Sequence, residues 1–286
     1  MAKANQVKST KEKIISTIFT LIVIVLFLCV LFPFVMIILN SFKAKIDIIK
    51  DPLSLSPTKG FSFQNFIDAF VGMHYLRAFG NSLFVTGFAT LITITFSSML
   101  AYYLVRYKNP FTTFMSNWIV ASMIIPFQAL MIPLVSIYGA KFGILNSRIT
   151  LVLMHVGFSM ALGTFIYQGF IKSNIPKALE EAALIDGASQ YGIFFKIVFP
   201  LLGPTTATLI ILNVLAFWND YLLPTLVLSK KELLTLPLTT YTFYGTYSAN
   251  YGVIMAALVL TVLPILILYF VLQRKIIDGV VSGAVK

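Results

Sequence analysis

Long apolar runs without charged residues alternate with short charged segments along this sequence. A helix that crosses the roughly 30 Å hydrocarbon core of a bilayer needs about 20 mainly apolar residues, and six runs reach that length. The pattern therefore predicts an all-α polytopic membrane protein with six transmembrane helices, built as a single transmembrane domain over residues 1–286. The predicted spans cover residues 14–41, 80–104, 112–138, 149–171, 193–218 and 251–272 approximately.

Proline and polar residues modify two of these spans. The span at 112–138 contains Pro126 and Pro133, which interrupt helical hydrogen bonding, and the run is too short for two crossings. We expect one kinked or broken helix there. The last uncharged run begins after Glu232, but its first half is polar and aromatic, so that only 251–272 is predicted to span.

The composition supports a membrane protein. Hydrophobic residues make up 58% of the chain and charged residues 11%, compared with roughly half and about a quarter in soluble domains. A typical soluble enzyme is thus excluded, and the single Cys29 permits no intrachain disulfide. The net charge of +11 arises from bases placed between the apolar runs, which favours contact with anionic lipid and excludes nucleic acid as the partner.

Charge also predicts the orientation. Six spans place both termini on one side of the membrane, and the loops on that side carry more Lys and Arg than the opposite loops. Lys8, Lys11 and Lys13 directly precede the first span, so both termini are predicted to be cytoplasmic. The first span is too long for a cleaved signal peptide and lacks a small-residue cleavage site, which predicts a retained anchor in the cell membrane.

Catalytic and energy-coupling motifs are absent from the sequence. It contains no G-x-x-x-x-G-K-[ST] phosphate-binding motif, and His74 and His155 have no metal-site spacing around them. We interpret His155 as a polar group bonded inside the helix bundle, not as a proton relay. No catalytic, metal or cofactor-binding residue is predicted. A membrane enzyme would show a polar cluster and a secondary carrier would show charges within its spans, so a transporter driven by another subunit is favoured.

One cytoplasmic segment carries more information than the other loops. Residues 176–188 are predicted to form a short helix, because Pro176 suits its start and Gly187 suits a left-handed stop. The acidic pair Glu180 and Glu181 favours the positive N-terminal end. Small and apolar positions form one stripe that fits the groove of a partner protein, although an interfacial helix on lipid is the alternative. The stripe consists of Ala178, Leu179, Ala182 and Ile185.

This segment resembles the EAA loop of bacterial ABC importer permeases. Glu181-Ala182-Ala183 is followed by Gly187 and then by Ile197-Val198-Phe199-Pro200, in the spacing of that loop. Phe199 replaces the usual leucine and conserves apolar bulk. Further matches resemble the carbohydrate subfamily of these permeases, of the maltose-importer G-subunit type. They are Asn81-Ser82-Leu83, Ala101-Tyr102 with Arg106, Phe142 to Ser147, Trp218 to Tyr221 with Pro224, and the tail from Gln273 to Lys286.

The resemblance implies the permease fold of an ABC importer that translocates a sugar or oligosaccharide. It implies a coupling helix docked on an ATPase dimer, which holds the ATP and Mg²⁺, and no cofactor in this chain. An F-type permease and an extracytoplasmic binding protein are the other implied partners. A non-sugar solute, or a secondary carrier, is the alternative function. The implied coupling residues are Glu180, Glu181, Ala182, Ala183, Asp186 and Gly187.

Two further groups of residues follow from the resemblance and from the chemistry of sugars. The tail residues Gly283, Ala284 and Lys286 are expected to contact the ATPase dimer. The loop from Leu222 to Asn250 is expected to face the binding protein. Amides and an aromatic ring at membrane depth are candidates for the substrate path, with hydrogen bonding between helices as the alternative role. These candidates are Asn117, Gln128, Asn213, Trp218 and Asn219.

Overall fold

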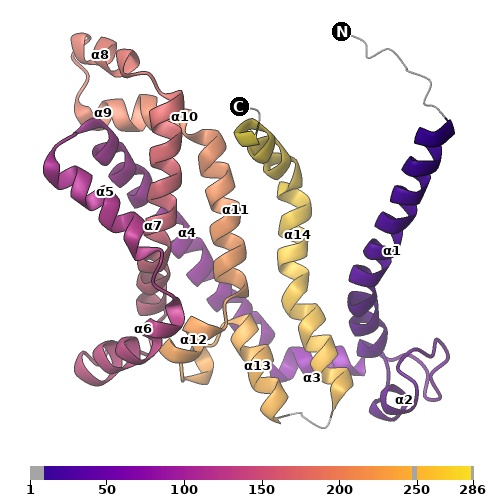
Figure 1. The fold of residues 1–286 in the computed structure, drawn as a ribbon. Coiled ribbons are helices and arrows are strands. Elements are labelled where there is room, and N and C mark those ends of the chain that lie inside the picture. Colours follow the sequence, from indigo (N-terminus) through magenta and orange to yellow (C-terminus); the bar gives the residue numbers. More distant parts are fainter. Residues whose placement is uncertain (1–9, 247–249, 285–286) are drawn as a thin grey trace. The chain divides into compact units, whose positions relative to one another are not determined.

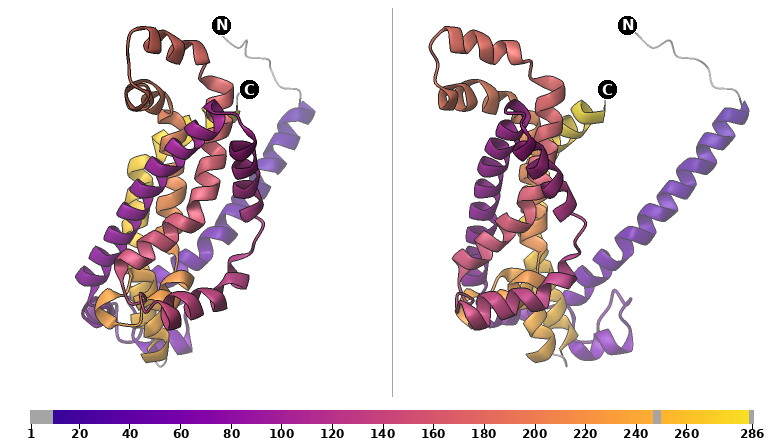
Figure 2. Two further views of the ribbon diagram at one scale, coloured as in Figure 1. Left: turned by 90° about the vertical axis from the view of Figure 1, so that its left-hand side faces the viewer. Right: turned by 60° about the vertical axis from the view of Figure 1, so that its left-hand side comes forward.

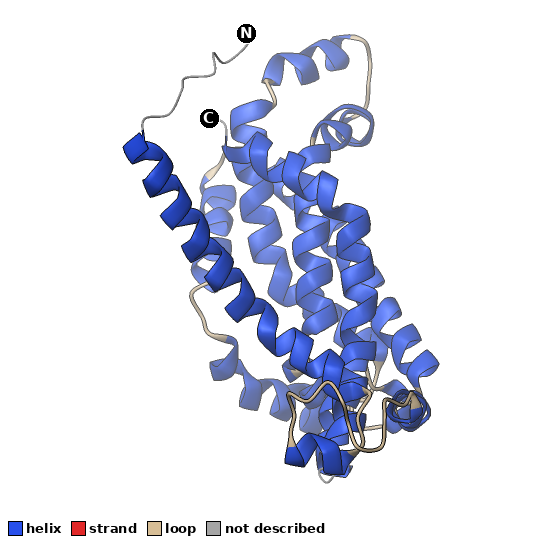
Figure 3. Ribbon diagram, turned by 90° about the vertical axis from the view of Figure 1, so that its right-hand side faces the viewer, coloured by secondary structure: helices blue, strands red, loops and turns tan. Residues whose placement is uncertain are grey.

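The protein is helical. The computed structural model describes residues 10–246 and 250–284, and all regular structure there is helix (Figure 1). Further views (Figure 2) and colouring by secondary structure (Figure 3) show the same architecture, with no strand among the described residues. The chain divides into two compact units, one of residues 1–72 and 244–260, the other of residues 73–243 and 261–286.

Among the described residues, four helices are each long and apolar enough to cross a membrane. Two bent pairs of helices bring the number of candidate spans to six if each pair counts as one span. The predicted all-α polytopic fold is therefore confirmed. The four single helices are α1 (Thr10–Ser41), α4 (Tyr75–Arg106), α7 (Arg148–Asn174) and α14 (Tyr251–Ala284).

The first bent pair confirms the break predicted in the third span. Helix α5 (Pro110–Ser122) meets α6 (Phe127–Leu134) at an angle of 95° between the axes, with α6 continued by the π-helix η1 (Val135–Lys141). Pro126 is the N-cap of α6. Since a residue before proline is pushed out of the helical conformation, the chain turns just ahead of Pro126.

The second bend, of 75°, was not among the sequence predictions. It separates the helical stretch that ends at Leu201 from a long helix in which Pro204 occupies the first turn. Pro204 has no N–H to donate to the carbonyl four residues earlier, so the helical ladder is interrupted there. The elements are α9 (Gln190–Ile193), η2 (Phe194–Val198), α10 (Phe199–Leu201) and α11 (Gly203–Asn219).

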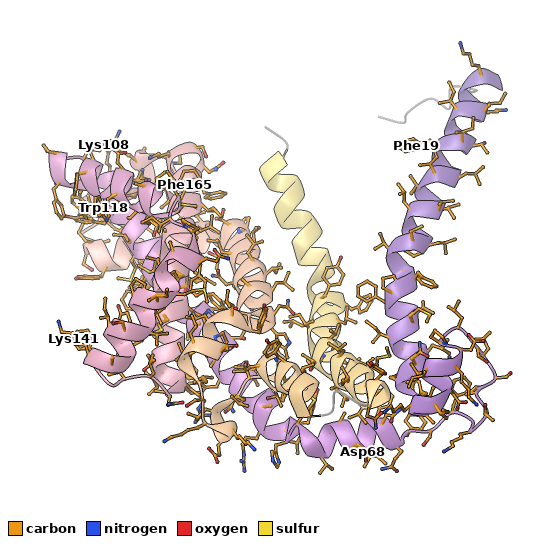
Figure 4. The ribbon with its side chains drawn as sticks, turned by 60° about the horizontal axis from the view of Figure 1, so that its bottom comes forward. Phe19, Asp68, Lys108, Trp118, Lys141 and Phe165 are labelled. Atoms are coloured by element: carbon orange, nitrogen blue, oxygen red, sulfur yellow. The ribbon has the colours of Figure 1, made fainter. Side chains whose placement is uncertain are left out.

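The first unit contains a long helix with an apolar surface and a compact cap. Helix α1 exposes apolar side chains on all sides, among them Phe19, which points away from the ribbon in Figure 4. Exposure of such a surface to water would be unfavourable, whereas in a bilayer the surface contacts lipid acyl chains that are equally apolar. The cap includes α2 (Lys45–Lys50) and α3 (Gln64–Gly72).

Asn65 of α3 ties this cap to the end of α1. Its Nδ2 donates to the carbonyls of Ser41 and Lys43, each at 2.9 Å, and so satisfies backbone acceptors at the end of α1. A Cβ atom at Gly252 would overlap the Asn65 amide, so glycine is required at this contact. The start of α14 therefore packs directly on the cap.

Two charged side chains organise the segment after α2. The buried Lys43 Nζ donates to the Pro52 carbonyl at 2.8 Å. The Asp47 carboxylate accepts from the N–H groups of Thr58 and Lys59 at 3.1 and 3.2 Å. Hydrogen bonds from Thr58 and Lys59 hold the pKa of Asp47 below its ordinary value, against the opposing effect of burial. Charged groups thus fix a segment that has no regular structure.

The second unit is built on the parallel pair α4 and α7, which pack along their lengths with α11 against them. Gly163 of α7 lies against Ser97 of α4, and a Cβ there would come within 2.8 Å of the Ser97 Oγ. Small residues at such a contact let two membrane helices approach closely. Tyr167 and Thr206 share a 2.8 Å hydrogen bond that ties α7 to α11.

We predict that Gly163→Leu destabilises the second unit, because the added side chain has no space beside Ser97. Overpacking of this kind costs about 1–3 kcal/mol. The apparent Tm in detergent, followed by the loss of monodisperse protein on heating, should fall by at least about 2 °C. Gly169→Leu is the matched control, because a Cβ at Gly169, also on α7, meets nothing within 4 Å. Equal Tm values for the two variants would contradict the packing argument.

Candidate functional site

Helix α8 (Lys177–Ile185) lies at one end of the second unit, beyond the ends of α4 and α7 (Figures 1 and 2). Its N-cap is Pro176, and it ends at Gly187 with φ of +80°. The N–H of Ala188 donates to the Ala183 carbonyl at 2.9 Å, which is the Schellman arrangement that a left-handed residue permits. The structure thus has a helix and a left-handed stop in the segment where the sequence predicts them.

Glu180 anchors this helix to α4. Its buried carboxylate pairs with Arg106, with 2.6 Å between Oε1 and Nη2 and 2.7 Å to Nε. The Tyr102 hydroxyl donates to Oε2 at 2.9 Å, and Arg106 Nη2 also donates to the Ile175 carbonyl at 2.9 Å. A carboxylate bound by three donors and a guanidinium that also holds the backbone make a well-satisfied buried pair. We call Tyr102, Arg106 and Glu180 the anchor.

The remaining predicted coupling residues lie on the outer surface of α8 and the turn after it. Glu181, Ala182, Asp186 and Gly187 are exposed, while Ala183 is half-buried against the apolar core. The predicted stripe is exposed as well, and its Ile185 side chain is 87% exposed. Of the six predicted residues, Glu180 alone points inward to a charged partner within the described chain.

Sequence reasoning missed the anchor role of Tyr102 and Arg106. Both were noted as a motif that closes the second span, but no function was assigned to them. The available signal was a lone arginine at the end of a span, predicted to lie on the same side of the membrane as the short acidic helix. Nothing in their spacing from Glu180 could indicate contact, since more than 70 residues separate the partners.

Asn81 organises the opposite end of the second unit. Its Nδ2 donates to the carbonyls of Glu232 and Leu234 at 2.8 and 3.0 Å, and its Oδ1 accepts from Arg148 at 3.0 Å. These bonds hold the loop that contains η3 (Lys231–Leu233) against the start of α4 and α7. The Asn-Ser pair that resembles the family pattern therefore has a structural role.

Asn146 holds the same loop from the other direction. It adopts a left-handed conformation with φ of +59°, and its Oδ1 accepts from the N–H groups of Ser229 and Lys230 at 2.6 and 3.2 Å. Asparagine tolerates this backbone conformation better than most residues. The loop after α12 (Leu222–Val227) is thus fixed by Asn81 of α4 and by Asn146, which lies in the loop before α7.

The predicted substrate-path residues do not form one site. Asn117 and Gln128 are exposed on α5 and α6, and Asn219 is exposed and donates to the Leu215 carbonyl at 2.9 Å. Two are buried: Asn213, whose Nδ2 lacks a partner among the described residues, and Trp218, which donates to the Thr261 carbonyl at 3.5 Å.

Of the residues predicted to contact the ATPase through the tail, Gly283 and Ala284 are the last two residues of α14. Lys286 lies outside the described residues.

Two adjoining cavities lie in the second unit, with volumes of about 550 and 430 Å³. None of the five predicted path residues lines either cavity. The smaller cavity is lined by His155 and Asp220, with 3.9 Å between His155 Nδ1 and Asp220 Oδ2. Asp220 follows the end of α11, and burial raises the pKa of its carboxyl, opposed by hydrogen bonds from Leu222 and Leu223.

Curated relatives match over nearly the whole chain. A probable starch degradation products transport system permease protein of Thermoanaerobacterium thermosulfurigenes is 43% identical, with 93% of this chain and 96% of the relative covered. A melibiose/raffinose/stachyose import permease protein of Bacillus subtilis is 36% identical, with 89% and 91% covered. More than nine tenths of the length of each of these two relatives is therefore covered by the match.

A solved structure and a family model agree with these relatives. The crystal structure of a bacterial ABC transporter involved in the import of alginate includes a chain of similar fold. Its TM-score is 0.75 at 22% identity, with 94% of this chain and 99% of that chain covered. The model of binding-protein-dependent transport system inner membrane components matches residues 93–281. This chain belongs to the family of inner membrane components of binding-protein-dependent transport systems.

Proposed function

We propose that this chain is the permease subunit of an ATP-driven importer that takes up a sugar or oligosaccharide. The observation that carries the proposal is a short helix, α8, that exposes an acidic and apolar face while a buried ion pair ties it to the long apolar helix α4. The energy enters through a partner ATPase that binds ATP and Mg²⁺, because the sequence has no nucleotide-binding motif of its own.

The exposed face of α8 is suited to a protein partner. Leu179, Leu184 and Ile185 are all exposed apolar residues, and an apolar patch rimmed by charge is typical of an interaction site. Glu181 and Asp186 add carboxylates that an arginine of the partner can bind in a bidentate manner. We propose that this face docks in a groove of the ATPase subunit, with Ala182 and Ala183 allowing close approach.

The anchor provides the mechanical connection. Movement of α8 would displace Glu180, and the bonds to Tyr102 and Arg106 would carry that displacement into α4. Ala183 and Ala188 also pack on the apolar cluster that joins α4, α7 and α9. A helix held at several points moves with its neighbours as a rigid body, so closure of the ATPase dimer would reorient the spans.

The proposed substrate class rests on the relatives. The names of several relatives describe the transport of sugars or oligosaccharides, including starch degradation products, raffinose and arabinooligosaccharides. We propose that the second transmembrane subunit is an F-type permease. We also propose that both termini lie in the cytoplasm, with Gly283 and Ala284 of the tail near the ATPase. Asn117, Gln128, Asn213, Trp218 and Asn219 stay a prediction for the substrate path.

Copurification and uptake test the proposal together. A tagged chain recovered from native membranes should bring an ATP-hydrolysing subunit, a second permease and a solute-binding protein. Proteoliposomes holding this complex should take up maltotriose, raffinose or arabinotriose when ATP is enclosed and the binding protein is outside. The absence of an ATPase from the purified complex would contradict the mechanism. Uptake of none of the three sugars would contradict the substrate class, and uptake without ATP would instead indicate a secondary carrier.

We predict that Gly187→Val and Glu181→Lys each uncouple ATP hydrolysis from uptake. A side chain at a positive φ costs about 1–2 kcal/mol, so valine would distort the turn after α8, and lysine would repel the partner's arginine. Sugar uptake per ATP hydrolysed should fall in both variants, with unchanged membrane insertion. Gly169→Val serves as the control, because Gly169 has an ordinary φ and open space around its Cβ position. Normal coupling in both variants would refute the docking role of α8.

We predict that Arg106→Glu and Glu180→Arg each impair uptake and that the double exchange restores part of it. Removing one partner of a buried ion pair costs about 3–5 kcal/mol, because the other charge is left uncompensated. Trypsin should cleave the α8 segment faster in each single variant than in the double variant. Lys108→Glu, an exposed position near Arg106 on the same side, is the charge control. Absence of any rescue by the double exchange would contradict the anchor.

A further inference from the structure

The smaller cavity of the second unit has a combination of polar and aromatic groups that the coupling mechanism does not use. Its volume of about 430 Å³ falls in the range of small-molecule sites. It lies where the bend between α5 and α6 faces α7 and the start of α12. The lining groups on which the argument rests are Ser122, Phe127, His155, Phe158 and Asp220.

His155 is buried but has incomplete hydrogen bonding. The residue is 4% exposed, and its Nε2 is enclosed without a partner among the described residues. Its Nδ1 faces Asp220 Oδ2 at 3.9 Å, which is too long for a direct hydrogen bond. The expectation of a histidine bonded within the bundle is therefore wrong. A ligand hydroxyl bonded to Nδ1 would give that nitrogen the hydrogen bond that it lacks among the described residues.

Asp220 supplies an oriented acceptor opposite this ring. Its Oδ1 accepts from the N–H groups of Leu222 and Leu223 at 2.9 and 3.4 Å, which holds the carboxyl group in place. Its Oδ2 faces the imidazole. One hydroxyl oxygen fits between the two side chains, because it can accept from Nδ1–H and donate its own proton to Oδ2. The pair therefore has the donor and acceptor pattern that recognises an alcohol.

Aromatic rings provide the complementary apolar surface. Phe127 and Phe158 stand edge to face with their centroids 5.1 Å apart, and both line the cavity. A pyranose ring has a C–H face that packs on aromatic rings, while its hydroxyls point outward to polar groups. Ser122 and Phe158 also line the larger cavity of about 550 Å³. A second sugar unit therefore has adjoining space.

We propose that His155, Asp220, Phe127 and Phe158 form a subsite that binds one pyranose unit of a neutral oligosaccharide during translocation. The assignment rests on the proposed import function, and it identifies the residues of this chain that would contact the sugar. A carboxyl acceptor disfavours an acidic sugar, whose carboxylate would meet Asp220 without a counter-charge. A metal-binding role is not supported, because the described residues contain no group of three metal-ligating side chains.

Cysteine protection tests the subsite in the assembled transporter. In a Cys29→Ser background, which removes the single native thiol, Ser122→Cys reports on the cavity and Ser136→Cys serves as an exposed control outside both cavities. Maltotriose, raffinose and arabinotriose are added separately to the complex, and the rate of maleimide labelling is measured. The sugar that the uptake assay identifies as transported should slow labelling at position 122 at least about fivefold and leave position 136 unchanged. Trigalacturonic acid should give no protection.

Substitutions within the subsite separate binding from a general defect. Asp220→Asn and His155→Phe should each raise the half-protective sugar concentration about tenfold, which corresponds to loss of roughly one hydrogen bond. The labelling rate without sugar and the ATPase rate without binding protein should stay within about twofold of the parent, which reports intact folding. Thr225→Ala, exposed on α12 outside the cavity, should behave as the parent.

Two results would overturn the subsite while leaving the import function intact. One is a transported sugar that fails to protect position 122. The other is a half-protective sugar concentration that stays the same in both Asp220→Asn and His155→Phe. If one of these variants fails to assemble, an unchanged value in the other overturns the subsite. Failure to transport any of the three sugars would instead count against the proposed substrate class, and it would remove the basis of the subsite as well.

Discussion

The buried pair between Glu180 and Arg106 is the interaction on which the end of the second unit that carries α8 depends. Two charges at the end of a membrane-spanning helix are stable only when each has an oppositely charged partner. Here the Tyr102 hydroxyl and the Ile175 carbonyl make further hydrogen bonds to the carboxylate and the guanidinium, respectively. The pair orients α8 so that Glu181 and Asp186 face outward. One acidic residue thus serves the fold, while its neighbour is free to serve the proposed partner.

The opposite end of the same unit depends on neutral amides. Asn81 and Asn146 use their side chains to satisfy backbone groups of the loop from Leu228 to Leu236, which has little regular structure of its own. Between the two ends, close contact of α4 and α7 at Gly163 leaves no room for a larger side chain. Specific side-chain contacts therefore hold the unit at both ends, which suits the proposed transmission of motion from α8.

Elements with strong local signals were predicted well. The apolar runs predicted the spans, Pro126 predicted the break between α5 and α6, and Gly187 predicted the end of α8. Each of these depends on residues close together in sequence. The bend near Pro204 was missed because its proline sits at a helix start, where proline is normally tolerated. The polar path candidates were chosen from residue type alone, and residue type does not determine which side chains meet.

The sequence by itself determined the membrane class, the helical fold and the short acidic helix that ends near Gly187, because hydrophobic length, proline and glycine act locally and do not need distant partners. The tertiary structure alone decided which of two adjacent glutamates is buried. It also decided that His155 and Asp220, 65 positions apart in number, share one cavity. Hydrogen bonds and cavities form between residues distant in the chain, and their partners are set only when the helices pack.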